Sequence, residues 1–321
     1  MRRVPCSLLL IGALLSNMPP TSGSDAGARP LPTAPLCPIF PSNNPWNRRV
    51  DRLPVHPRSD AIVASIGLDE GLHPDFGSGW WEGARIGIPL TTIPRGQKKV
   101  PVKFGYASES DPGPYPIPSG APIEGGRSST GDRHVIVVDR AECLLYELFD
   151  AHRKDGGKRW VAGSGATWNL KSNHLRPTGW TSADAAGLPI LAGLTRYGEV
   201  QDGDIDHALR FTVSRTRRAF VYPARHFASA LTSRKLPAMG QRLRLKKELR
   251  HLWIPSSSTH HPAGPQALRH DRRRQRVRLV HQRCPVVWME QRRSASVGTR
   301  RRPTFRSRGR RLPQALTPRQ G

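Results

Sequence analysis

The stretch His134-Val135-Ile136-Val137-Val138-Asp139 is nearly continuous in β-branched residues, and Leu144-Leu145-Tyr146-Glu147-Leu148-Phe149-Asp150 follows it after a short turn. Branched and aromatic side chains pack well on the pleated surface of a sheet. Two runs of this kind joined by a short turn predict a β-hairpin. We expect this hairpin to lie at the centre of the fold.

Further short runs with strand character lie on both sides of the hairpin. Residues 241–246 alternate polar and apolar side chains strictly, as a half-exposed strand does. The apolar runs 86–89 and 100–104 contain Pro and are expected to form loops and edge strands, because Pro cannot donate to a central ladder. Other expected strands cover residues 159–163, 208–213 and 219–223, and a short helix is expected over residues 60–67.

The composition agrees with a mainly β architecture. The 321 residues include 31 Pro and 30 Gly, and helical periodicity is weak. Short strands separated by Gly and Pro turns predict a single domain over residues 41–249, with a few short helices. We expect a sandwich, jelly-roll or barrel-like arrangement. The hydrophobic share is only 36%, so we expect the N- and C-terminal ends to be disordered.

The first 28 residues have the composition of a secretory signal. Arg2 and Arg3 precede the apolar run of residues 6–15, and small or turn-prone residues follow from Pro19 to Ala28. A positive start, an apolar middle and a small-residue cleavage region are the three parts of such a signal. We therefore expect a secreted, extracellular protein with a Pro-rich lead over residues 29–40. No run of 18 apolar residues exists, so no membrane span is expected after signal removal.

Removal of the signal would leave three cysteines, Cys37, Cys143 and Cys284. Disulfides persist in exported proteins, and Cys37 with Cys143 would join the N-terminal lead to the central hairpin. Closing a loop of that size stabilises a protein by roughly 3–5 kcal/mol in the chain-entropy model. The alternative is that both residues are buried free thiols. We predict the Cys37–Cys143 disulfide.

The basic charge of the chain is concentrated at its C-terminal end. The formal net charge is +27, and residues 251–321 contain 17 Arg, no Lys and two acidic residues. One interpretation is a solvated basic arm that binds nucleic acid or an anionic surface. The other is translation in a shifted frame, because a GC-rich gene read out of frame yields much Arg, Pro, His, Gln and Ser. We favour the shifted frame over a tail that binds nucleic acid.

The shifted-frame interpretation can be examined codon by codon. Codons for residues 270–283 can be chosen so that reading one base later gives Met-Ile-Val-Ala-Asp-Asn-Gly-Ser-Asp-Trp-Phe-Ile-Ser-Gly. That string has two strand-like runs around an Asn-Gly turn, which is the favoured chemistry of a two-residue hairpin loop. We expect the shift to begin near Leu249 or Arg250, and residues 250–321 to form a disordered tail.

Six long and specific strings run through most of the mature chain. They are Cys37–Pro41 (CPIFP), Gly71–Gly77 (GLHPDFG), Gly131–Asp139 (GDRHVIVVD), Leu145–Ala151 (LYELFDA), Gly179–Ile190 (GWTSADAAGLPI) and Asp206–Phe211 (DHALRF). Through these strings residues 37–249 resemble an uncharacterised family of exported bacterial proteins. The resemblance implies export but no reaction. It also implies a continuation past Leu249 into a helix and the hairpin described above, from which this chain departs.

Five polar residues within or beside the expected strands are candidates for catalysis: His134, Tyr146, Glu147, His207 and Arg210. In a polysaccharide lyase, Arg neutralises the uronate carboxylate while Tyr or His moves the proton; a pair of acids suits hydrolysis instead. Further members of the lyase set are Tyr222, Arg225 and His226, and further acids are Asp204 and Asp206. Two His with one carboxylate could also hold a metal, but the separations along the chain are not diagnostic. No metal ligands are predicted, and the sequence leaves the cofactor unknown.

Two further groups are candidates for ligand binding. Trp80 and Trp81 lie beside Gly-rich turns and could stack on sugar rings, or they could fill the core. His73 and Asp75 lie in a compact loop that could bind a ligand or could be an Asx-type turn. These residues support a non-catalytic module that binds carbohydrate or cell wall.

Several enzyme classes are disfavoured by missing motifs. The chain has no Gly-rich phosphate loop, no Cys-x-x-Cys pair and no Gly-x-Ser-x-Gly elbow, so Ser164 is a weak candidate nucleophile. The leading hypothesis is a secreted protein that acts on extracellular polysaccharide as a lyase or hydrolase. The alternatives are the non-catalytic carbohydrate-binding module and, less favoured, a nucleic-acid binder.

Overall fold

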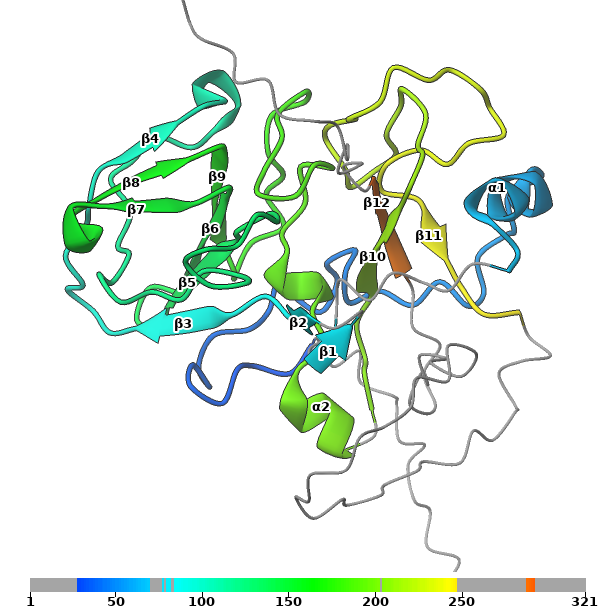
Figure 1. Ribbon diagram of the computed structural model, residues 1–321. Helices are drawn as coiled ribbons and strands as arrows, with labels where there is room; N and C mark the ends of the chain where they lie inside the picture. Colours follow the sequence, from blue (N-terminus) through cyan, green and yellow to red (C-terminus); the bar gives the residue numbers. More distant parts are fainter. Residues whose placement is uncertain are drawn as a thin grey trace, which may run out of the picture.

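The central hairpin is part of a four-stranded sheet in the computed structural model (Figure 1), which describes residues 28–69, 77, 79–81, 84–202, 204–246 and 287–291. β5 (Val135–Asp139) and β6 (Leu144–Phe149) pair antiparallel, with Val137 opposite Tyr146. β9 (Ser164–Asn169) extends the sheet next to β6, and β3 (Leu90–Ile93) lies parallel to β5. The predicted hairpin is confirmed.

The two faces of this sheet contribute to two different cores. Successive side chains of a strand point to opposite faces. Ile136, Val138 and Leu145 therefore pack in one cluster with the N-terminal lead and the 183–194 segment. Val137 and Leu148 pack on the other side, in a cluster that includes Trp160 and Tyr115. Glu147 lies on the first face and its neighbour Tyr146 on the second.

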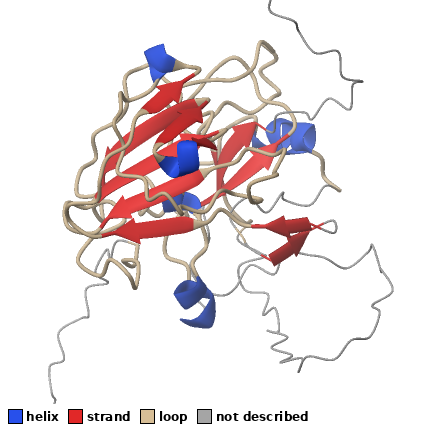
Figure 2. Cartoon of the chain, turned by 60° about the vertical axis from the view of Figure 1, so that its left-hand side comes forward, coloured by secondary structure: helices blue, strands red, loops and turns tan. Residues whose placement is uncertain are grey.

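A second sheet covers that second face. It consists of β4 (Val102–Phe104), β8 (Arg159–Ala162) and β7 (His152–Lys154), in that order, and lies beside the central sheet in Figure 1. Trp160 of β8 is 1% exposed and packs in the same core as Tyr146. Figure 2 shows that strands and loops make up most of the described chain and that its helices are short.

A third sheet includes a strand from the basic tail. β10 (Leu209–Val213) pairs in parallel with β12 (Val287–Gln291), which pairs antiparallel with β11 (Arg242–Leu243). β12 is an exception to the expected absence of regular structure in the tail. The rest of the tail, residues 247–249 before it and the expected signal sequence up to residue 27 lie outside the described residues.

The remaining elements are small. β1 (Gly79–Trp81) and β2 (Ala84–Ile86) form a two-stranded hairpin. The α-helices of the described chain are α1 (Ser59–Ile66) and α2 (Tyr197–Asp202), and the 3₁₀ turns are η1 (Ala107–Glu109), η2 (Asp155–Gly157) and η3 (Leu191–Gly193).

The architecture is mainly β with two short α-helices in the described chain, as predicted. Each sheet has two free edges, and the described strands form no closed barrel. Two expected strands are shorter than predicted. The run at residues 241–246 pairs only at Arg242–Leu243. The run at residues 219–223 makes one bridge, Phe220 with Met239, and Pro223 has no N–H to donate to a longer ladder.

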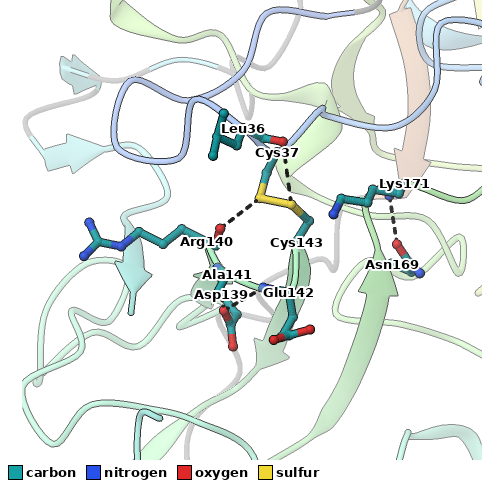
Figure 3. Close-up of a disulfide and its surroundings, with 9 residues drawn as sticks. All are labelled: Leu36, Cys37, Asp139, Arg140, Ala141, Glu142, Cys143, Asn169 and Lys171. Atoms are coloured by element: carbon teal, nitrogen blue, oxygen red, sulfur yellow. Dashed lines mark hydrogen bonds between the residues drawn. A yellow bond between two sulfur atoms is a disulfide. The ribbon is translucent and has the colours of Figure 1, made fainter. Parts of the chain in front are cut away.

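Cys37 and Cys143 form the predicted disulfide (Figure 3), with their Cα atoms 5.2 Å apart. Both residues are 2% exposed. Cys143 ends the turn between β5 and β6 at φ 55°, and Asp139 Oδ1 braces that turn by accepting the N–H groups of Ala141 and Glu142 at 2.9 and 3.1 Å. The disulfide therefore attaches the N-terminal lead to the tip of the central hairpin.

Among the described residues, no helix has the length and apolar character needed to cross a membrane.

Candidate functional site

Three of the sequence candidates, His134, Glu147 and Arg210, lie in one buried group with Glu124 and Asp184, which we call the buried polar cluster. His134 directly precedes β5, Glu147 is on β6 and Arg210 is on β10. His134, Glu147, Asp184 and Arg210 are at most 4% exposed. The cluster therefore joins the central sheet, the third sheet and the 182–191 segment in the protein interior.

The imidazole of His134 bridges two acceptors. Its Nδ1 lies 2.6 Å from Glu124 Oε2 and its Nε2 lies 3.2 Å from the carbonyl oxygen of Ala183. A carboxylate and a carbonyl only accept, so both ring nitrogens donate and the ring is held as an imidazolium. Burial lowers the pKa of His134, but the hydrogen bond and charge of Glu124 outweigh it and raise that pKa. Burial raises the pKa of Glu124, and His134 reverses this, so that pKa is lowered.

Glu147 holds the 190–191 segment against the central sheet. Its carboxylate accepts the N–H of Ile190 at 3.0 Å, the N–H of Leu191 at 2.9 Å and the indole N–H of Trp168 at 3.2 Å. The residue is 0% exposed. Burial raises the pKa of Glu147 to about 7, against the opposing effect of the hydrogen bonds from Leu191 and Ile190.

Asp184 and Arg210 link the loop before Ile190 to β10. Arg210 Nη2 lies 3.1 Å from Asp184 Oδ2, and the side chain of each is 5% exposed. Asp184 Oδ1 also accepts the N–H of Ala186 at 2.8 Å. The hydrogen bond from Ala186 to Oδ1 lies within the loop of Asp184 itself, and it fixes the direction in which Oδ2 faces Arg210.

Tyr146 and His207 are not part of this cluster. Tyr146 packs its ring 5.3 Å from that of Tyr115 in the second core, and burial raises its pKa. His207 is 4% exposed; its Nδ1 lies 2.8 Å from the carbonyl oxygen of Ala208 and its Nε2 lies 3.1 Å from Glu199 Oε1. Glu199 also accepts a short hydrogen bond from Arg196. The five catalytic candidates therefore do not converge on one open site.

The structure does not describe the side chains of the four ligand-binding candidates. Trp80 and Trp81 lie on β1, opposite Arg85 and Ala84 on β2, and their side chains are outside the described part of the structure. His73 and Asp75 lie outside the described residues. Within the described ranges, no group of three or more His, Cys, Asp or Glu residues is arranged to hold a metal ion.

The structure shows a more accessible group, formed by Glu109, Trp180, Arg225 and His226, which we call the Trp180 surface. His226 Nδ1 lies 2.8 Å from the carbonyl oxygen of Ala185, and its Nε2 lies 3.8 Å from Glu109 Oε2. The side chains of His226 and Glu109 are 25% and 34% exposed. Trp180 and Arg225 are half-buried, so all four side chains reach solvent.

A buried arginine supports this surface from beneath. The guanidinium of Arg176 lies over the indole rings of both Trp168 and Trp180, 5.6 and 5.5 Å from their centroids. Arg176 forms an ion pair with Asp111 and donates to the carbonyl oxygens of Thr181 and Glu109 at 2.7 and 2.9 Å. These contacts fix the 176–181 loop against η1 and hold Trp180 in place.

Sequence reasoning named Arg225 and His226 as secondary candidates but missed Glu109 and Trp180. Trp180 lies in the conspicuous string of residues 179–190, which offered a signal for it. Glu109 lies in η1, far from those strings, and accepts the N–H of Thr181 at 3.2 Å. The position of Glu109 depends on this long-range contact with Thr181, which no local sequence pattern predicts.

The raised pKa of Glu147 predicts a pH dependence of stability. The unfolded carboxyl loses its proton near pH 4.5 and the folded one near pH 7, so stability falls as the pH rises between these values, by about 3 kcal/mol in total. The raised pKa of His134 acts in the same direction, since its contribution is complete below about pH 6.5 and is lost as the pH rises through the folded value. Glu124, with its lowered pKa, contributes above about pH 4.5 and loses that contribution as the pH falls.

Urea unfolding between about pH 5 and pH 8 measures this dependence. We expect the free energy of unfolding to be highest near pH 5, and Glu147→Gln to remove the part of the decline due to Glu147. A free energy of unfolding that stays constant or rises across this range would contradict the assigned ionisation of the cluster.

In comparisons with known proteins, no family model matches the chain, and no curated protein or solved structure matches it.

Proposed function

We propose that the protein is exported and binds an extracellular polysaccharide, without catalysis by the buried polar cluster. The observation that carries this proposal is the contrast in exposure. Glu147 and His134 are 0% and 3% exposed and are engaged in structural contacts, whereas Glu109 and His226 reach solvent beside Trp180. A group that binds or converts a polymer must touch it, so the Trp180 surface is the better binding face.

The chemistry of the Trp180 surface supports a carbohydrate ligand. A half-buried indole offers an apolar face with a polar edge, which suits the face of a sugar ring. Arg225, His226 and Glu109 offer charged and hydrogen-bonding groups around it. Export is supported by the Cys37–Cys143 disulfide, since disulfides persist in oxidising compartments, and by the signal-like first 28 residues.

Retention on immobilised polysaccharides tests this proposal. Trp180→Ala is expected to weaken retention about tenfold, equivalent to ~1.4 kcal/mol of binding free energy, because the stacking face is removed. Tyr197→Ala is the matched control, since Tyr197 is an aromatic residue on α2 that is 78% exposed. Equal retention of the Trp180→Ala variant and the wild type would contradict the assignment. Loss of retention in Trp80→Ala or Trp81→Ala alone would instead place the binding face on β1.

We also propose a sandwich or jelly-roll arrangement of the sheets, membership of the exported bacterial family that residues 37–249 resemble, and a shifted frame beyond Leu249. The absence of Lys and the 17 Arg in residues 251–321 support the shifted frame. The pairing of β12 with β10 is the observation against it. The nucleotide sequence around the codons for Leu249 and Arg250 decides whether the tail is translated in a shifted frame or in the normal one.

A further inference from the structure

His226 has one ring nitrogen fixed and one available. The carbonyl oxygen of Ala185 lies 2.8 Å from Nδ1, and a carbonyl only accepts, so Nδ1 carries a proton. The basic lone pair of the neutral ring is therefore on Nε2. Nε2 faces Glu109 Oε2 at 3.8 Å, which is longer than a hydrogen bond, and the side chain is 25% exposed. The contact with Ala185 thus assigns the proton to Nδ1 and leaves Nε2 as the nitrogen that faces Glu109.

Glu109 is held in position to stabilise a proton on that nitrogen. Its Oε2 accepts the N–H of Thr181 at 3.2 Å, and its own carbonyl oxygen accepts from Arg176 at 2.9 Å. These contacts fix the carboxylate at the end of η1. The carboxylate faces Nε2, the ring nitrogen that would accept a proton in acid–base catalysis.

Arg225 supplies a positive charge next to His226. Its Nε donates to the carbonyl oxygen of Arg176 at 2.9 Å, and its Nη2 donates to Thr178 Oγ1. The guanidinium therefore lies along the 176–178 segment, directly before Trp180. A guanidinium binds a carboxylate in a planar, bidentate manner, which suits the carboxylate of a uronic acid.

We propose that the Trp180 surface cleaves a uronate-containing polysaccharide by β-elimination, with His226 Nε2 as the base. This inference rests on the proposed function, since it requires a polysaccharide bound at Trp180. Nε2 takes the proton from C5 of the uronate, whose carboxylate is neutralised by Arg225. The C5–H electron pair forms the C4=C5 double bond while the C4–O bond to the neighbouring sugar breaks. The leaving oxygen takes the proton back from the imidazolium, so neither water nor a co-reactant is consumed.

The roles divide within the surface. His226 and Arg225 touch the substrate and are the catalytic residues, and Trp180 provides the platform for the sugar ring. Glu109 is a positioning residue, because it acts through the imidazole. The buried polar cluster contributes only by fixing the 182–191 segment, whose Ala185 carbonyl sets the tautomer of His226.

The test uses the full-length protein with polygalacturonate and alginate, and dextran as a neutral control, followed by the ultraviolet absorbance of unsaturated uronate ends. His226→Gln is expected to lower the rate of product formation at least about 100-fold, while retention on the same polymer falls by a far smaller factor, because Trp180 and Arg225 still bind it. His152→Gln is the matched control, since His152 on β7 is another exposed histidine whose Nε2 faces a carboxylate, 2.8 Å from Asp150 Oδ1. This control is expected to have wild-type activity.

The positioning role of Glu109 has its own readout. Glu109→Gln is expected to lower kcat at constant KM, and Glu109→Asp to restore part of the loss.

Absence of unsaturated product from the wild type, with retention of the acidic polymers, would overturn the elimination proposal and leave the binding proposal unaffected. Absence of both product and retention would overturn elimination and polysaccharide binding together. A His226→Gln variant with full turnover would likewise overturn the role of His226.

Discussion

Glu147→Ala is expected to lower the free energy of unfolding by about 3–5 kcal/mol, because three buried donors lose their acceptor at once. Those donors are the N–H groups of Ile190 and Leu191 and the indole N–H of Trp168. None of them can turn to water, since Ile190 and Leu191 are 0% exposed and Trp168 is 5% exposed. The loss should be larger than that of an ordinary surface substitution by several kcal/mol.

Chemical unfolding of two further variants makes this expectation specific. Glu147→Gln retains an oxygen that can accept from the same donors, so it is expected to lose much less stability than Glu147→Ala. Glu142→Ala removes a carboxylate on the turn after β5 whose side chain is 49% exposed, and is expected to be nearly neutral. If Glu147→Ala were as stable as Glu142→Ala, Glu147 would not hold η3 to the sheet.

Removal of the Cys37–Cys143 disulfide is expected to lower the free energy of unfolding by about 3–5 kcal/mol, since the cross-link closes a long loop in the unfolded chain. The two residues are 106 positions apart, and the cross-link attaches the N-terminal lead to the central hairpin. The lead contributes Ile39 and Phe40 to the first core, so its detachment also weakens the packing of that core.

The double variant Cys37→Ala with Cys143→Ala provides the measurement, by urea unfolding with and without a reductant. Wild-type protein should lose stability on reduction, and the double variant should be insensitive to reductant. Identical unfolding curves for oxidised and reduced wild type would show that the disulfide does not stabilise the folded state.

The predictable part of the fold is local in sequence. The β5–β6 hairpin followed from two β-branched and aromatic runs around a short turn, and α1 from a short apolar stretch before Gly67. The strand at residues 241–246 was overestimated because alternation measures one strand only, and pairing depends on what lies next to it. β12 was not anticipated, since its partner β10 is more than seventy residues earlier in the sequence.

The sequence identified the candidate catalytic residues by their chemical type, but it did not identify the residues with which they form ion pairs. His134 is paired with Glu124, His207 with Glu199, and Arg210 with Asp184. Glu124 and Glu199 come from segments without a motif, and Asp184 lies in the 179–190 string, which gave no indication of its pairing with Arg210. These contacts turn presumed reactive groups into structural ones. Tyr146 and Glu147 are adjacent on β6, and strand geometry alone places them on opposite faces, which already separates their roles.

Mapping of backbone amide shifts by NMR during titration with an oligogalacturonate shows whether the Trp180 surface receives the ligand while the buried polar cluster maintains the fold. We expect saturable shifts at Glu109, Trp180, Arg225 and His226, and none of comparable size at Trp80 and Trp81. Shifts concentrated on β1, or no saturable shift at the Trp180 surface, would contradict this account.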